Sequence, residues 1–113
     1  MDNKLKTIVK TLDDKQAEKI HIVKVTDLTV LTDYFVIAGG NSSTHTKALA
    51  DYVEEEMSKI GIEPKHTEGK NDWIVLDYSD IIVHVFYKET REYYKLERLW
   101  SDGELIDISQ FLE

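Results

Sequence analysis

The stretch WIVLDYSDIIVHVFY, residues 73–87, decides the fold. Its two ends, Trp73–Asp77 and Ile81–Tyr87, are rich in β-branched and aromatic residues, and they flank a short connection. This pattern is typical of two strands joined by a tight turn, so it predicts an antiparallel hairpin. Both faces of the second strand are largely apolar, because alternate side chains point to opposite faces. We expect helices to cover one face of the sheet. Apolar surface that stays uncovered on the opposite face is then a candidate protein-contact surface.

Two strands and two helices are predicted within the first 61 residues. Residues 34–38 form a continuous apolar run, which is typical of a central strand, and residues 20–25 are β-branched and partly alternating. Apolar residues at helical spacing predict a first helix through residues 5–12. A second helix is expected to begin after the capping residues 41–43 and to end at Gly61.

The remaining elements complete an α+β pattern. A short strand is expected at residues 64–68, and a final helix is expected to begin near Thr90 and to run through Trp100. An apolar-rich tail follows. The order α, β, β, α, β, β, β, α predicts a two-layer sandwich with a mixed β-sheet and helices on one face. No linker or repeat interrupts it, so we expect a single domain over residues 1–113.

Composition narrows the classes of function. The 113 residues carry a net charge of −8, which argues against rRNA or other nucleic acid as the main binding partner. The absence of cysteine excludes disulfides, thiolate zinc sites and cysteine nucleophiles. No signal sequence or membrane-spanning run is evident, so we expect a cytoplasmic protein with no membrane contact.

The turn between the strand at residues 34–38 and the following helix, which we call the elbow (residues 39–43), is the first candidate ligand-binding site. A helix N-terminus with small side chains can hold an anion, and a similar elbow in nucleotidyltransferases works beside two magnesium-binding carboxylates. The carboxylates available here are Asp77 and Asp80. They lie three residues apart across a turn and do not project side by side from one strand. A tight turn with a helix cap is therefore favoured over a ligand site.

Histidine gives no stronger sign of catalysis or metal binding. The four histidines are far apart, and a zinc site would have to be assembled from three separate elements. His84 alternates with Ile82 and Phe86 on one face of the second hairpin strand. A hydrogen-bonded structural histidine is favoured there, because no serine or aspartate stands in an obvious relay with it. We predict no catalytic residue, no metal site and no cofactor.

A set of ordered motifs resembles the ribosomal silencing factor S family, also called Iojap-related proteins. The motifs are residues 33–38 running into 40–43, then 68–69, 73–77, 80–86 and 91–100. They span nearly the whole chain up to Trp100, and the ordered set is specific although each motif alone is weak. The triplet 44–46 departs from the more basic or amide-bearing residues expected after the elbow.

The resemblance implies a translation regulator that is not an enzyme. Members of this family bind the large ribosomal subunit through its ribosomal protein number fourteen, block joining of the small subunit and so repress translation. A role in large-subunit assembly and a tendency to form homodimers are also implied. The fold is expected to be similar to the nucleotidyltransferase superfold without its catalytic residues.

The resemblance also implies where the partner binds. Its contact surface involves the sheet and the last helix, and the positions carried over to this chain are Trp73, Leu76, Asp77, Asp80, His84, Tyr94, Glu97 and Trp100. We expect the carboxylates among them to lie near the contact with a basic ribosomal protein and residues 54–56 to lie on a remote helix face. Contact with rRNA is expected to be peripheral at most.

Two hypotheses of other classes stay open. A nucleotidyltransferase-like enzyme or nucleotide-binding protein would use Gly39, Gly40 and Ser42 together with Asp77 and Asp80. A purely structural assembly protein would only chaperone a ribosomal intermediate, without affecting the joining of mature subunits.

Overall fold

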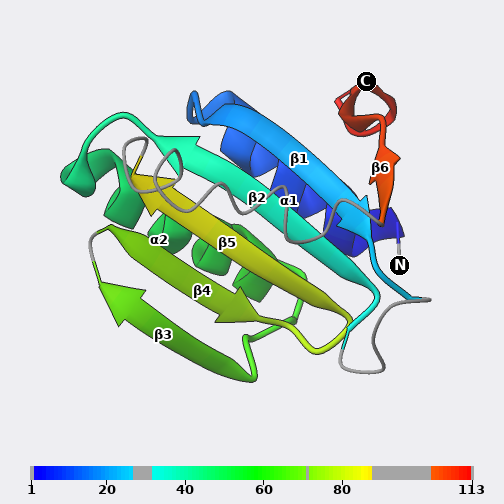
Figure 1. Ribbon diagram of the computed structural model, residues 1–113. Coiled ribbons are helices and arrows are strands. Elements are labelled where there is room, and N and C mark those ends of the chain that lie inside the picture. The colour runs from blue at the N-terminus through cyan, green and yellow to red at the C-terminus, as the bar shows by residue number, and fades with distance from the viewer. Residues whose placement is uncertain (1, 27–31, 71, 88–102, 113) are drawn as a thin grey trace.

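The structure is a computed structural model that describes residues 2–26, 32–70, 72–87 and 103–112. Figure 1 shows its elements in chain order. They are α1 (Asp2–Asp14), β1 (Glu18–Lys24), β2 (Tyr34–Gly40), α2 (Ser43–Lys59), β3 (His66–Lys70), β4 (Trp73–Asp77), β5 (Ile81–Tyr87), β6 (Glu104–Ile106) and the 3-10 helix η2 (Ile108–Phe111). The final helix expected at residues 90–100 lies outside the described residues.

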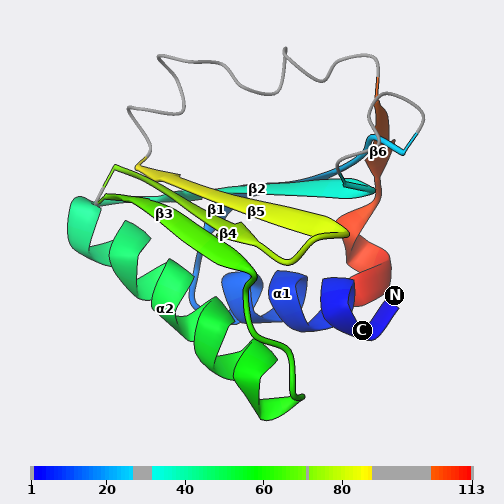
Figure 2. The same ribbon diagram turned by 90° about the horizontal axis from the view of Figure 1, so that it is seen from below.

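The described strands form one mixed sheet. Their order is β3-β4-β5-β2-β1-β6, in which β2 and β5 are parallel and the other neighbours are antiparallel. Figure 2 shows that α1 and α2 both lie on the same side of this sheet. The prediction of an α+β sandwich with a mixed sheet and helices on one face is therefore confirmed, as is the antiparallel hairpin of β4 and β5.

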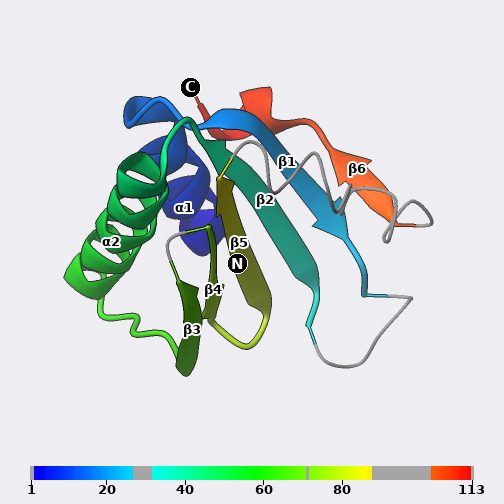
Figure 3. The same ribbon diagram turned by 60° about the vertical axis from the view of Figure 1, so that its left-hand side comes forward.

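The two helices divide the covered face between them. In Figure 3, α2 lies along the part of the sheet that contains β4 and β5, and α1 lies behind it toward β1. The apolar stripe predicted for α1 is buried, at Leu5, Ile8, Val9 and Leu12. It packs in one core with alternate residues of the strands, including Ile81, Val83 and Val85.

Both ends of α2 follow the capping signals in the sequence. Ser42 is the N-cap, and its side chain accepts a hydrogen bond from the backbone N–H of His45 at 2.9 Å. Ile60 is the C-cap, and Gly61 follows with φ of +79°. A glycine adopts this left-handed conformation without the steric cost that a Cβ brings.

The sequence was less informative at the outer strands. The strand expected at residues 64–68 begins two residues later, at His66. The tail forms β6, which pairs with β1, and places Phe111 of η2 in the core beside the α1 stripe. No helix in the described part of the chain is long and apolar enough to cross a membrane.

The close packing of the β2 end against α2 generates a prediction about Gly40. A Cβ on Gly40 would lie 2.8 Å from both the Cα and the backbone nitrogen of Thr46, so either strand or helix would have to move. We expect Gly40→Ala to lower the free energy of unfolding by about 3 kcal/mol, measured by urea denaturation. Gly61→Ala is the matched control, because nothing lies within 4 Å of its added Cβ and only the backbone conformation opposes it. It should cost about 1 kcal/mol. Equal losses in the two variants would contradict a packing role for Gly40.

Candidate functional site

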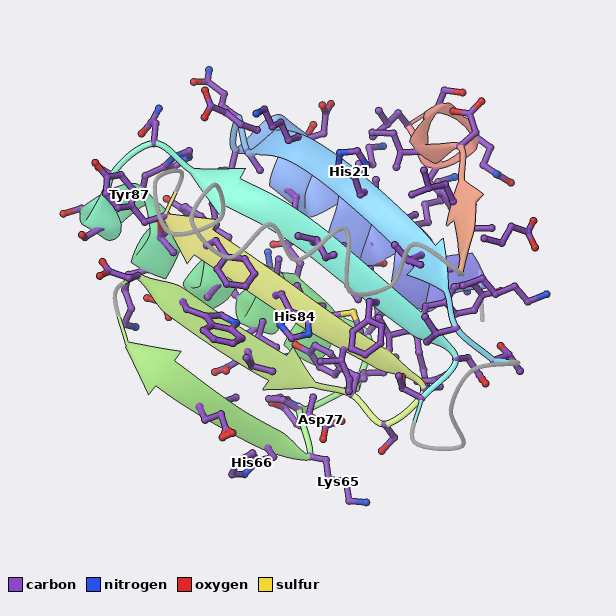
Figure 4. All side chains as sticks on the ribbon, in the orientation of Figure 1. His21, Lys65, His66, Asp77, His84 and Tyr87 are labelled. Carbon is purple, nitrogen blue, oxygen red and sulfur yellow. The ribbon has the colours of Figure 1, made fainter. Side chains whose placement is uncertain are left out.

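The sheet face that points away from α1 and α2 carries a continuous set of candidate contact residues. The β4–β5 register pairs Trp73 with Phe86, Val75 with His84 and Asp77 with Ile82. Because paired residues share a face, all six side chains lie on this side of the sheet. Figure 4 looks onto the face and shows His84 over its middle and Asp77 near the end of β4.

An aromatic cluster forms the centre of this face. Its members are Phe35, Trp73, His84 and Phe86. The rings of Trp73 and Phe86 stack with centroids 4.9 Å apart, and His84 lies 5.3 Å from Phe35. The indole Nε1 of Trp73 donates a hydrogen bond to Nδ1 of His84 at 3.2 Å. The predicted structural role of His84 is thus supported by a specific bond.

The environment of His84 keeps its imidazole neutral. The side chain is buried, and burial penalises the charged form, which lowers the pKa of His84 to about 4. The bond from Trp73 requires an unprotonated Nδ1, so it acts in the same direction. His84 therefore holds Trp73 in place and does not present a positive charge to a partner.

Accessibility varies across the face. Ile37 and Phe86 are 0% exposed, so the middle of the face is an interior and not an open apolar surface. Toward β3 the side chains become half-buried and then exposed. We call this accessible part the β3–β4 strip, and it consists of Trp73, Val75, Asp77 and Ile82 with the exposed His66 and Glu68 of β3.

The structure brings three of the predicted contact residues together and separates two others. Trp73, Asp77 and His84 share the face described above. Leu76 points the opposite way, into the helix-covered core, and is 2% exposed. Its placement at a contact surface is therefore wrong, because three residues along a strand reverse the face relative to Trp73. Tyr94, Glu97 and Trp100 lie outside the described residues.

Asp80 is the second residue that the structure separates from the strip. Both of its carboxylate oxygens lie 3.2 Å from Nζ of Lys4, so its charge is engaged with α1 on the other side of the sheet. Asp77 has a local role as well, because its Oδ1 accepts the backbone N–H of Ser79 at 2.8 Å and shapes the turn. Its half-buried carboxylate still lies on the strip.

Four residues of the strip were missed as contact candidates. Val75 and Ile82 are on the same face as Trp73 and Asp77 by simple alternation, so the sequence held that signal. His66 and Glu68 join them because β3 pairs His66 with Asp77 and Glu68 with Val75. That register depends on the strand beginning at His66 and could not be read from the chain alone.

The residues of the nucleotide-binding alternative lie at two ends of the sheet. The backbone oxygen of Asp80 accepts the N–H groups of Asp33 and Tyr34, beside the first residue of β2, whereas the elbow begins at the last two residues of β2. A seven-residue strand separates them by roughly 20 Å. These carboxylates and the elbow therefore do not form one site.

The elbow is also occupied by internal hydrogen bonds. Nδ1 of His45 accepts the N–H of Asn41 at 3.0 Å, and Nε2 of His45 lies 2.9 Å from the backbone oxygen of Lys15. Ser42 accepts from the N–H groups of His45 and Thr46. The geometry supports a helix cap tied to the turn after α1. Within residues 2–26, 32–70, 72–87 and 103–112, no group of three or more acidic or histidine side chains is arranged to hold a metal ion.

The burial of His84 predicts a specific loss of stability in acid. The unfolded chain takes up a proton at the ordinary pKa of 6.5, whereas the folded protein resists it until about pH 4. The stability that the buried, neutral His84 adds to the folded protein is therefore present above pH 6.5 and is lost as the pH falls to 4. We expect the wild-type unfolding free energy to fall by about 3 kcal/mol more than that of His84→Leu between neutral pH and pH 4, because leucine does not titrate. Parallel pH profiles from urea denaturation of the two proteins would contradict this.

Comparisons with known proteins agree with this architecture. The family model described as "Ribosomal silencing factor during starvation" matches residues 1–113. The ribosomal silencing factor RsfS of Bacillus subtilis is 38% identical over 106 residues, which cover 92% of this chain and 90% of the relative. A mouse relative, named mitochondrial assembly of ribosomal large subunit protein 1, is 34% identical over 90% of this chain and 49% of its own length. A crystal structure of a protein from Chromobacterium violaceum superimposes with a TM-score of 0.84 at 30% identity, covering 88% of this chain and 84% of the other. The chain therefore belongs to the ribosomal silencing factor family.

Proposed function

We propose that this protein represses translation by binding the large ribosomal subunit through its ribosomal protein number fourteen. Once bound, it would occupy space that the small subunit needs, so joining is blocked without any bond being made or broken. The observation that carries this proposal is the β3–β4 strip in a chain that belongs to the ribosomal silencing factor family. The proposal requires no catalytic group, cofactor or metal, and it places the protein in the cytoplasm with the ribosomes.

The composition of the strip fits a protein partner. Trp73 is half-buried and its ring is held by Phe86 and His84, so little freedom is lost when a partner covers it. Val75 and Ile82 add apolar area beside it. Asp77 and Glu68 supply negative charge at the edge, which attracts a basic ribosomal protein and disfavours the RNA around it. Contact with rRNA would then be peripheral at most.

A role in assembly of the large subunit is the second part of the proposal. The name of the mouse relative connects that protein with mitochondrial large-subunit assembly. A factor that binds the joining surface of an immature large subunit would also keep small subunits away until assembly is complete. One contact surface would therefore serve both activities.

Self-association is expected to compete with this contact. If two copies pair through the β3–β4 strip, the same Trp73 cannot reach the ribosome while the homodimer persists. Added large subunits should then shift the protein from dimer to bound monomer in analytical ultracentrifugation.

Substitutions on the two sides of the sheet test the proposed surface. Trp73→Ala should weaken co-sedimentation with purified large subunits by about tenfold or more, because an anchoring aromatic is removed. Asp77→Asn is the milder second variant, since an amide oxygen can still accept the N–H of Ser79 and the turn is kept. It should weaken binding by about threefold to tenfold and restore subunit joining to the same degree.

Glu55→Gln is the matched control, because Glu55 is an exposed acid on α2, away from the strip. It should bind as the wild type does. The proposal would be abandoned if the wild type neither bound large subunits nor slowed joining, or if Glu55→Gln weakened binding as much as Asp77→Asn. Saturable binding of a magnesium nucleoside triphosphate that is lost in Asp77→Asn would favour the nucleotidyltransferase-like alternative.

A further inference from the structure

A second surface lies on the helix-covered side of β3 and β4, opposite the β3–β4 strip. A groove of about 540 Å³ runs between α2 and the β3–β4 pair. Figure 2 shows α2 extending beneath these strands. The floor of the groove is apolar and consists of Ala50, Ile74 and Leu76. Its walls are Lys47, Asp51 and Glu54 from α2 and residues 67–69 of β3, of which Glu68 turns its side chain to the opposite face.

The β3 wall is a sheet edge. Within the described part of the chain, β3 pairs only with β4 and is the first strand in the sheet order. Its residues 66–69 are exposed. The outward backbone N–H and C=O groups of such a strand are available to an incoming extended segment, which gains main-chain hydrogen bonds by joining the sheet.

The charge of the groove favours one chemical class of binding partner. Nζ of Lys47 lies 2.8 Å from Oδ1 of Asp51, so these two charges offset each other. Glu54 then leaves the groove negative. Glu55 and Glu63 add negative charge in an adjoining hollow beside α2, where Lys59 is paired with Glu56. A basic segment is attracted to such a surface, and a nucleic acid is repelled.

The same charges argue against a second copy of the chain at this edge. Antiparallel pairing of two β3 strands about a two-fold axis would bring the α2 helices of both copies toward each other across the junction. Each helix brings Glu54 and Glu55, and like charges held close together are destabilising. The edge is therefore better suited to a partner of opposite charge.

We propose that the groove between α2 and β3 binds an extended, lysine- and arginine-rich segment of a partner protein, which adds a strand to β3. Alternate side chains of the added strand would point to the helix side of the sheet. Basic side chains there meet Glu54, and one small apolar side chain covers the floor formed by Ala50 and Ile74. This inference does not rest on the proposed ribosome contact, because that contact uses the opposite face of the sheet.

Titration of the full chain with a defined peptide tests the inference by NMR. The probe is a short synthetic peptide in which lysine alternates with threonine and valine, and the same peptide with glutamate in place of lysine is the negative control. We expect saturable shifts of the Thr67 and Glu68 amides, slower hydrogen exchange along β3, and no response to the glutamate peptide. Slower exchange distinguishes strand addition from loose charge attraction.

Two charge reversals on α2 provide the matched comparison. Glu54 lines the groove, whereas Glu55 is exposed on the same helix and does not line it. Glu54→Lys should lower the affinity for the lysine peptide by about tenfold, and Glu55→Lys should change this affinity by less than about twofold. Trp73→Ala and Asp77→Asn should leave the peptide affinity unchanged, so failure of one proposal can be told from failure of the other.

Three outcomes would overturn the inference. The first is the absence of saturable shifts in β3. The second is equal weakening by Glu54→Lys and Glu55→Lys, which would mean general attraction to an acidic protein. The third is a concentration-dependent shift of β3 amides without peptide, which would assign the edge to a second copy of the chain.

Discussion

The parallel pairing of β2 with β5 is the constraint on which the rest of the structure depends. It runs over seven residue pairs, from Tyr34 opposite Ile81 to Gly40 opposite Tyr87, and joins the two halves of the chain at the centre of the sheet. Because both strands carry apolar residues on both faces, each face must be buried. One face packs against α1 and α2, and the other forms the aromatic cluster around His84. The same register places the elbow and Asp80 at opposite ends of the sheet, which separates the groups that nucleotide chemistry would need side by side.

The features that could be predicted from sequence are those determined by neighbouring residues. The β4–β5 hairpin depends on two apolar runs and a short turn, and the caps of α2 depend on Ser42 and Gly61, so local patterns were sufficient. The pairing of β6 with β1 could not be found this way, because only three residues form the strand and their partners lie far back in the chain. Short outer strands have only a weak sequence pattern, and their formation depends on pairing with a neighbouring strand.

The candidate contact residues show the same division. Trp73, Asp77 and His84, which the resemblance groups as contact residues, share one face of the sheet. Leu76 was carried over with them although the two-residue period of a strand places it with Ile74 in the core. The engagement of Asp80 with Lys4 spans 76 positions in the chain, and no local pattern encodes such a contact. A resemblance locates the segment that matters, but the strand geometry decides which of its side chains can be reached.

The imidazole of His45 has a mechanical consequence for the whole molecule. By accepting from Asn41 at one nitrogen and bonding the backbone oxygen of Lys15 with the other, it joins the start of α2 to the turn that ends α1. The imidazole of His45 thus connects the two helix ends through hydrogen bonds, and it restricts movement of one helix relative to the other beneath the sheet. Restricting the movement of the helices also restricts the sheet that they support, so a partner that docked on the outer face would lose less conformational freedom on association.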